Sequence, residues 1–299
     1  MQNSEKVDRS SDGVKKEARP VLRIVPAEKG KRDLGRFRVT YRIYGHSGPF
    51  IICVNGAQQT MASWHAAVLK FSGSYRILLY DAPGQARGTI LSGSAAVSID
   101  EQVEVLRSLI HAILKPEEPI HLVGASWGAV IAAIYAARDP ERVKFLLLAS
   151  FGLQPSPQMM KVVEGARQLY FSEHRSDGAK LIIEMFGQRL SEENKRRMIL
   201  QFQNLTNEQF DSFYEHIKVI ASTSHLTDYA DLGKVRAKTV IINGADDQLL
   251  DNRDLEAASK LIPNTEVRII PNAGHFLHLE REEILDIYQD YLKANIASV

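Results

Sequence analysis

The chain has 299 residues, of which 44% are hydrophobic and 24% charged, enough for one large α/β domain with an insertion or two smaller domains. The formal net charge of +1 argues against a dedicated nucleic-acid-binding protein. The single cysteine, Cys53, excludes an intramolecular disulfide and a cysteine-based metal site, and it fits a reducing, cytoplasmic location.

The first 20 residues mix charges of both signs and contain no apolar run typical of a secretory signal. We therefore predict a disordered N-terminal tail over 1–20. The longest apolar run, 129–137, ends at Arg138 and is too short to cross a bilayer, so no membrane span is expected.

The first half of the chain shows strand patterns. Residues 21–25 are predicted as a strand, followed by a charged turn over 28–33. Residues 37–44 alternate in polarity and predict an edge strand. The apolar runs 50–54 and 76–80 are typical of buried parallel strands.

A capping-box pattern marks the next helix. Ser98 and Glu101 have the required spacing, and the helix is predicted to end before Pro116. A strand, a helix and a further strand are then predicted at 120–123, 129–137 and 144–149.

Between 152 and 230 strand patterns disappear and helical segments rich in Met, Phe and Tyr follow. Strands and helices then alternate again, at 239–243, 253–261, 266–270 and 281–294. This order predicts an α/β fold with a mostly parallel, doubly wound sheet. The core is expected over 21–151 and 231–299, with 152–230 as a helical lid.

The segment Gly124-Ala125-Ser126-Trp127-Gly128 is the most informative motif. It lies between a buried strand and a helix, the context in which G-x-S-x-G forms a nucleophile elbow. The glycines allow a sharp turn and close helix–strand packing. A serine hydroxyl is a weak nucleophile by itself, so Ser126 requires a base and an acid elsewhere.

His275 is the best candidate for the base, because it follows the last predicted strand in a loop of small residues. Two aspartates, Asp246 and Asp247, follow an earlier strand and could orient it. The order Ser, Asp, His is the one expected of an α/β-hydrolase.

Two backbone N–H groups should stabilise an oxyanion. We expect them from Trp127, after the nucleophile, and from Ala57, in the loop after the strand 50–54. Cys53 is a rival nucleophile, but it lies in an apolar strand with no cation nearby, which is typical of a buried core residue. No H-E-x-x-H spacing is present, and no metal or cofactor is expected.

These residues resemble the α/β-hydrolase superfamily over nearly the whole chain after the tail, and the loop Asp81-Ala82-Pro83-Gly84 resembles its D-x-P-G motif. The resemblance favours Asp247 as the acid, with Asp246 as the alternative. A narrower resemblance, to bacterial acyltransferases acting on 3-hydroxyacyl-acyl carrier protein, rests on the following segments: Val54-Asn55-Gly56, Ala62-Ser63-Trp64, Ala125-Ser126-Trp127-Gly128, Phe151-Gly152-Leu153, Gly165-Ala166-Arg167-Gln168, Ile242-Asn243-Gly244 and Gly274-His275-Phe276-Leu277-His278-Leu279-Glu280.

Apolar side chains should line an acyl pocket under the lid. The candidates are Met159, Met160, Tyr170, Phe171, Met185, Phe186 and Phe276. The alternative is that such side chains pack the lid onto the core, and we expect only a minority of them to line the pocket. The basic run Lys195, Arg196 and Arg197, with Arg189 nearby, could dock an acidic carrier protein or the phosphates of coenzyme A. Because Glu192 and Glu193 adjoin it, a solvated helix face with paired charges is the favoured alternative.

Taken together, these features predict that the protein is a serine acyltransferase or hydrolase. We expect it to act on fatty acyl, including 3-hydroxyacyl, thioesters or esters through an acyl-enzyme. The substrate could be carried on acyl carrier protein or coenzyme A. A plain carboxylesterase or lactonase that uses water is the first alternative. A non-catalytic ligand-binding protein on the same fold is the second.

Overall fold

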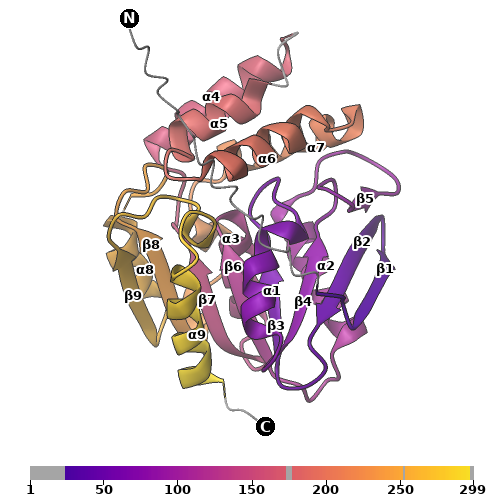
Figure 1. Cartoon of the computed structure of the whole chain (residues 1–299), viewed down its shortest axis with the longest axis vertical. Coiled ribbons are helices and arrows are strands. Elements are labelled where there is room, and N and C mark those ends of the chain that lie inside the picture. The colour runs from indigo at the N-terminus through magenta and orange to yellow at the C-terminus, as the bar shows by residue number, and fades with distance from the viewer. Residues whose placement is uncertain (1–23, 173–176, 252, 297–299) are drawn as a thin grey trace, which may run out of the picture.

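The computed structural model describes residues 24–172, 177–251 and 253–296. In these ranges one nine-stranded sheet has the order β1-β2-β4-β3-β6-β7-β8-β9, with the short β5 beside β2 (Figure 1). Pairs that involve β2 are antiparallel and the others are parallel, so the predicted mostly parallel sheet is confirmed. The strands are β1 (Glu28–Leu34), β2 (Phe37–Tyr44), β3 (Phe50–Val54), β4 (Arg76–Asp81), β5 (Thr89–Ile90), β6 (Ile120–Ala125), β7 (Val143–Ala149), β8 (Lys238–Gly244) and β9 (Thr265–Ile270).

Helices bury both faces of this sheet. The α-helices are α1 (His65–Phe71), α2 (Ile99–Ile113), α3 (Trp127–Arg138), α4 (Pro157–Tyr170), α5 (Gly178–Phe186), α6 (Glu192–Gln203), α7 (Asn207–Ser222), α8 (Arg253–Leu261) and α9 (Ile284–Asn295). Helices α2, α3 and α8 pack on one face, and α1 and α9 on the other. Along β3, Ile52 points into the first layer, whereas Ile51 and Cys53 point into the second. Burial on both faces explains why the apolar runs predict the central strands.

The N-terminal elements differ from the prediction. Of the strand predicted at 21–25, residues 21–23 lie outside the described residues, and Ile24 and Val25 belong to no strand. The predicted charged turn over 28–33 is wrong, because Glu28–Leu34 form β1 and pair with β2 along their whole length. β1 is a largely exposed edge strand, so polar residues occupy both its faces and no apolar alternation marks it.

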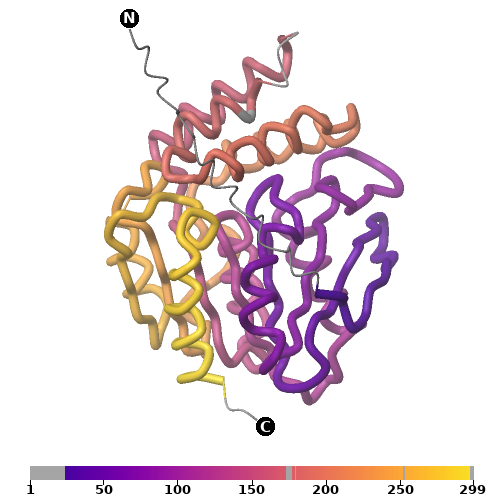
Figure 2. Tube along the Cα trace, in the orientation of Figure 1, coloured from indigo at the N-terminus to yellow at the C-terminus, as the bar shows by residue number. Residues whose placement is uncertain are grey.

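Helices α4 to α7 belong to an insertion (residues 152–230) that separates β7 from β8 in the chain, although these strands are neighbours in the sheet. Within the insertion, α4 packs against α5 and α7, and α5 packs against α6. Figures 1 and 2 show these helices stacked beyond the end of the sheet where β7 leads into them. The insertion therefore covers the carboxyl edge of the parallel strands, where ligands bind in open α/β sheets. In the part of the chain that the structure describes, no helix is both long and apolar enough to cross a membrane.

A buried histidine joins the C-terminal segment to the core. His278 lies in the 3₁₀ helix η5 (Leu277–Leu279), and its ring stacks on Trp64 with centroids 4.8 Å apart. Its Nε2 donates to the carbonyl of Ser63 at 3.2 Å, whereas its Nδ1 is buried with no partner among the described residues. Burial lowers the pKa of His278 to about 4, so the folded protein holds this imidazole neutral.

We expect the free energy of unfolding to fall as the pH drops from about 6.5 towards 4. The unfolded histidine takes up its proton at a higher pH than the folded one, so acid favours the unfolded chain by up to about 3 kcal/mol. His278→Phe keeps the ring stack and removes this titration. Its unfolding free energy in urea should therefore decline less steeply across this pH window, and identical pH slopes in the two proteins would contradict the assignment.

Candidate active site

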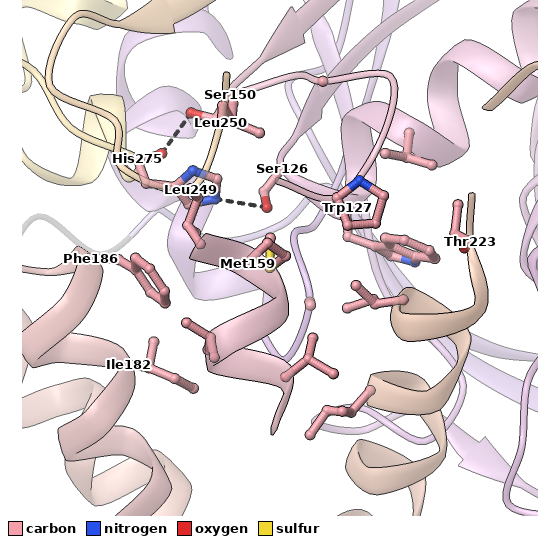
Figure 3. Close-up of a pocket in the computed structure, with 18 of the residues that line it drawn as sticks. Ser126, Trp127, Ser150, Met159, Ile182, Phe186, Thr223, Leu249, Leu250 and His275 are labelled. Atoms are coloured by element: carbon pink, nitrogen blue, oxygen red, sulfur yellow. Dashed lines mark hydrogen bonds between the residues drawn. The ribbon is translucent and has the colours of Figure 1, made fainter. Parts of the chain in front are cut away.

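Ser126 lies at the sharp turn between β6 and α3, facing the insertion (Figure 3). Its φ of 53° and ψ of −122° fall in a region that side-chain-bearing residues rarely adopt. The N–H of Ser126 donates to the carbonyl of Ala149 at 2.8 Å, which anchors the turn on β7. The predicted strand–turn–helix context is therefore present, with the hydroxyl at the carboxyl edge of the sheet.

The glycines around Ser126 are required by packing. A Cβ atom on Gly124 would lie 2.5 Å from the carbonyl oxygen of Gly128. A Cβ atom on Gly128 would lie 2.2 Å from the carbonyl oxygen of Val54, at the end of β3. Because both clashes involve backbone, only glycine lets α3 start this close to β3.

Ser126, His275 and Asp247 form one hydrogen-bonded row. His275 Nε2 lies 2.9 Å from Ser126 Oγ, and His275 Nδ1 lies 2.8 Å from Asp247 Oδ2 (Figure 3 shows the first contact). Since a carboxylate only accepts, Nδ1 donates to Asp247 and Nε2 is left to accept the serine O–H. The side chains of His275 and Asp247 are 6% and 0% exposed, so solvent screens this row little.

The structure separates the two candidate aspartates. Asp247 follows β8, and its Oδ1 also accepts the N–H of Leu249 at 2.9 Å, which fixes the carboxylate. Asp246 instead forms an ion pair with Arg189 of the insertion. The geometry thus joins Asp247, and not the alternative Asp246, to His275.

The His275 loop is held by residues to which the sequence analysis assigned no role. Ser150 Oγ donates to the carbonyl of His275 at 2.6 Å (Figure 3). The Glu280 carboxylate accepts the N–H groups of Gly274 at 2.7 Å and Phe276 at 2.9 Å. A polar residue directly after an apolar strand, and the acidic end of the His275 motif, are the signals that could have identified them.

Ala57 and Trp127 both line the space in front of Ser126. Trp127 is the first residue of α3, where N–H groups lack intrahelical partners. The N–H groups next to Ala57 are occupied: Gly56 donates to Gln59 Oε1 at 3.2 Å and Gln58 to Gln85 Oε1 at 2.8 Å. Among the hydrogen bonds of the described residues, none uses the N–H of Ala57 or Trp127, so both remain available to an oxyanion.

Core and insertion together clamp the peptide after Ala57. Gln58 has a φ of 57°, its N–H is held by Gln85, and its carbonyl accepts Gln201 Nε2 from α6 at 2.7 Å. His216 of α7 contacts Gln85 through its Nδ1 at 3.5 Å, and burial lowers the pKa of His216 to about 4. The insertion therefore positions the loop that carries one predicted oxyanion donor.

A cavity of about 180 Å³ opens in front of Ser126 and His275, and we call it the first cavity (Figure 3). Of the predicted pocket residues, Met159, Phe186 and Phe276 line it. Most of the remaining lining is apolar, and helices α4, α5 and α7 contribute to it Val162, Val163, Ala166, Ile182, Phe213, Ile217 and Ile220. Such a surface suits a hydrocarbon chain.

The other four predicted pocket residues do not line the first cavity. Met160 is 38% and Phe171 70% exposed. Tyr170 stacks on Tyr214 with centroids 4.0 Å apart. Met185 packs at the margin of a small cluster formed by the insertion and the segment after β8. Met159 and Met160 are consecutive on α4, and a helix turns consecutive side chains about 100° apart, so only one of them faces Ser126.

The structure also shows the surroundings of Cys53 and of the basic run at 195–197. Cys53 is buried in β3, and burial raises the pKa of its thiol, which disfavours a nucleophilic thiolate. Lys195 pairs with Glu192, and Arg197 pairs with Glu193, both along α6. These pairs fit the solvated-face alternative for the basic run. Within the described residues no cluster of three His, Cys, Asp or Glu side chains could hold a metal ion.

The fold and the Ser126 site together point to a known family of enzymes. A family model described as alpha/beta hydrolase fold matches residues 49–282. The match covers most of the chain, which therefore belongs to the α/β-hydrolase family.

Relatives of known function include a lipase and a transacylase. The chain is 27% identical over 259 residues to the monoacylglycerol lipase ABHD6 of Bos taurus, covering 82% of this chain and 76% of that one. It is 24% identical over 264 residues to the (R)-3-hydroxydecanoyl-ACP:CoA transacylase of Pseudomonas aeruginosa, covering 87% and 86%. The solved structure of MGS-M2, an α/β hydrolase from a deep-sea metagenome library, matches with a TM-score of 0.75 at 21% identity, covering 88% of this chain and 97% of that one. The protein is thus a hydrolase or acyl transferase of this family.

Gly128→Ala should disable the site. The added Cβ meets the backbone of Val54, so α3 and the loop that leads to Ala57 must separate. We expect esterase kcat to fall at least about tenfold and the melting temperature to fall as well. Gly73→Ala is the matched control, because a Cβ there meets nothing within 4 Å. Equal behaviour of the two variants would show that this close approach is not needed.

Gln201→Leu should lower kcat about five- to tenfold, because it removes the hydrogen bond to the Gln58 carbonyl, and Gln201 does not line the first cavity. Gln203→Leu, an exposed position on the same helix, is the control. A purely structural role for Gln201 would instead lower the melting temperature and leave kcat at 25 °C unchanged.

Proposed function

We propose that Ser126 is a catalytic nucleophile, that His275 is its general base and that Asp247 orients and stabilises the imidazolium. The observation that carries this proposal is the hydrogen-bonded row of these three side chains at the mouth of an apolar cavity. The proposed reaction is acyl transfer or hydrolysis on fatty acyl, including 3-hydroxyacyl, thioesters or esters.

The proposed mechanism has two halves. Ser126 Oγ attacks the acyl carbonyl carbon while His275 Nε2 takes its proton, and the N–H groups of Ala57 and Trp127 hold the oxyanion. The intermediate then collapses, the bond to the leaving group breaks, and the proton on Nε2 passes to the departing oxygen or sulfur. A hydroxyl, a thiol or water next attacks the acyl-enzyme along the same path and frees Ser126.

The acyl group is proposed to be a fatty chain. The lining of the first cavity by α4, α5 and α7 is nearly all apolar, and flexible Met159 can adjust to chains of different shape. The name of the transacylase relative specifies a 3-hydroxydecanoyl group, which supports the 3-hydroxyacyl assignment. Acyl carrier protein or coenzyme A would then be the carrier.

Hydrolysis of plain carboxylic esters is the second candidate. The likeness to a monoacylglycerol lipase at 27% identity favours it. The chemistry at Ser126 is the same in both cases, and only the group that resolves the acyl-enzyme differs.

Ser126→Ala should lower turnover of a 4-nitrophenyl alkanoate and of a 3-hydroxyacyl thioester by at least about a thousandfold, because the covalent intermediate can no longer form. Intact-mass measurement should show an acyl adduct on the native protein and none on the variant. Cys53→Ala, the control for the rival nucleophile, should retain activity. Full activity of Ser126→Ala would refute the nucleophile, and free acid as the sole product with every acceptor would refute transfer.

A further inference from the structure

A second cavity of about 210 Å³ lies beside the first, between α6 and the segment 57–63. The two cavities share lining residues Ala57, Gln58, Gln59, Ile182 and Phe276. They therefore meet where the predicted oxyanion donor lies and at the residue that follows His275. A substrate held at Ser126 can extend into both.

The two cavities differ in chemistry. The first is lined mainly by aliphatic and aromatic side chains, whereas the second adds Asn194 and Gln201 to apolar residues such as Met198. The amide nitrogens of Asn194 and Gln201 already donate to the carbonyls of Leu279 and Gln58, so these side chains offer a ligand their amide oxygens. Arg197 also lines the second cavity, but it is paired with Glu193. With its one cation compensated, this lining suits a neutral chain that carries both apolar and hydrogen-bonding groups.

The side chain of Gln58 provides a second observation that indicates a ligand. Its backbone is clamped on both sides, but its side-chain Nε2 is buried and has no hydrogen-bond partner in the described part of the chain. Gln58 lines both cavities, but its Nε2 has almost no accessible surface, so the side chain must rotate before this donor reaches a ligand there. A buried donor left unpaired is costly, and an oxygen of a bound substrate would satisfy it.

We propose that the second cavity binds the part of the substrate beyond the scissile carbonyl, a neutral extended chain with an acceptor oxygen that takes a hydrogen bond from Gln58 Nε2. This inference rests on the proposed function, with the acyl chain in the first cavity. Since a leaving group and an acceptor pass through the same transition state in opposite directions, one cavity serves both. An amide-bearing thiol, which joins a short alkyl spacer to a carbonyl oxygen, has this chemistry.

Three octanoyl thioesters test the proposal: those of ethanethiol, of pentanethiol, and of N-acetylcysteamine, which matches pentanethiol in length and adds an amide. Each variant is compared with the native protein on the same thioester, so the intrinsic reactivity of each leaving group cancels. Met198→Trp fills the second cavity, and it should lower kcat/KM for both long leaving groups about tenfold more than for the ethyl thioester. Gln58→Met keeps the side-chain length and removes the donor, and its extra loss of about tenfold should be confined to the N-acetylcysteamine thioester.

Leu200→Trp is the matched control, because Leu200 is on the same helix, is 50% exposed and lines neither cavity. It should affect the three thioesters equally. Equal losses on all three thioesters in Met198→Trp and Gln58→Met would overturn the proposal. So would a loss in Met198→Trp that follows the length of the acyl chain and not that of the leaving group. If the native protein forms no acyl-enzyme with any of the three, the proposed function itself fails.

Discussion

At Ser126 the backbone passes from β6 into α3 through a φ of 53° and a ψ of −122°, a conformation that costs on the order of 1–3 kcal/mol for a residue with a side chain. The surrounding packing enforces it: the N–H of Ser126 is tied to Ala149 of β7, and the absent side chain of Gly128 lets α3 begin against the end of β3. This one constraint sets the direction of the serine hydroxyl and the position of the Trp127 N–H, and it fixes their distance from the loop after β3. Because the strands are parallel, the loops after β8 and β9 reach the same edge and bring Asp247 and His275 to the hydroxyl.

The insertion not only covers the carboxyl edge of the sheet but also holds the loop that carries Ala57. Its helix α6 holds the carbonyl of Gln58 through Gln201, and α7 contacts Gln85, which holds the N–H of the same residue. A second contact runs from Gln209 of α7 to the carbonyl of Ala86 at 2.8 Å. The loop that carries Ala57 is therefore shaped from both sides, by the core and by the insertion. Movement of α6 would change the loop that carries Ala57 and the lining of the second cavity together, so access to that cavity and the geometry of the loop are physically coupled.

The parts of the molecule that could be predicted from the sequence are those with local causes. The capping box of Ser98 and Glu101 is present as expected at the start of α2, and the apolar runs in β3, β4 and β6 mark strands buried on both faces. The edge strand β1 carries no apolar alternation, because its stability comes from hydrogen bonds to β2 and not from burial. The clamp on Gln58 joins residues 143 positions apart, a separation for which the local sequence contains no signal. The sequence also does not show which side of each insertion helix faces the first cavity. Composition makes both Met159 and Met160 candidates, and only the packing of α4 determines which of them lines the cavity.

On the proposed mechanism, transfer and hydrolysis compete for one acyl-enzyme. Its carbonyl would be held at the junction of the two cavities, where Ala57 and Phe276 line both. With an acyl chain in the first cavity, as proposed, water could attack only through the space that the leaving group has vacated. A neutral acceptor that occupies the second cavity would exclude water from that space and also satisfy the buried Gln58 donor, which an apolar leaving group cannot do. On this assignment the serine, histidine and aspartate form the acyl-enzyme but do not select the group that receives the acyl chain. The fate of the acyl group then depends on how well the second cavity retains an acceptor relative to water.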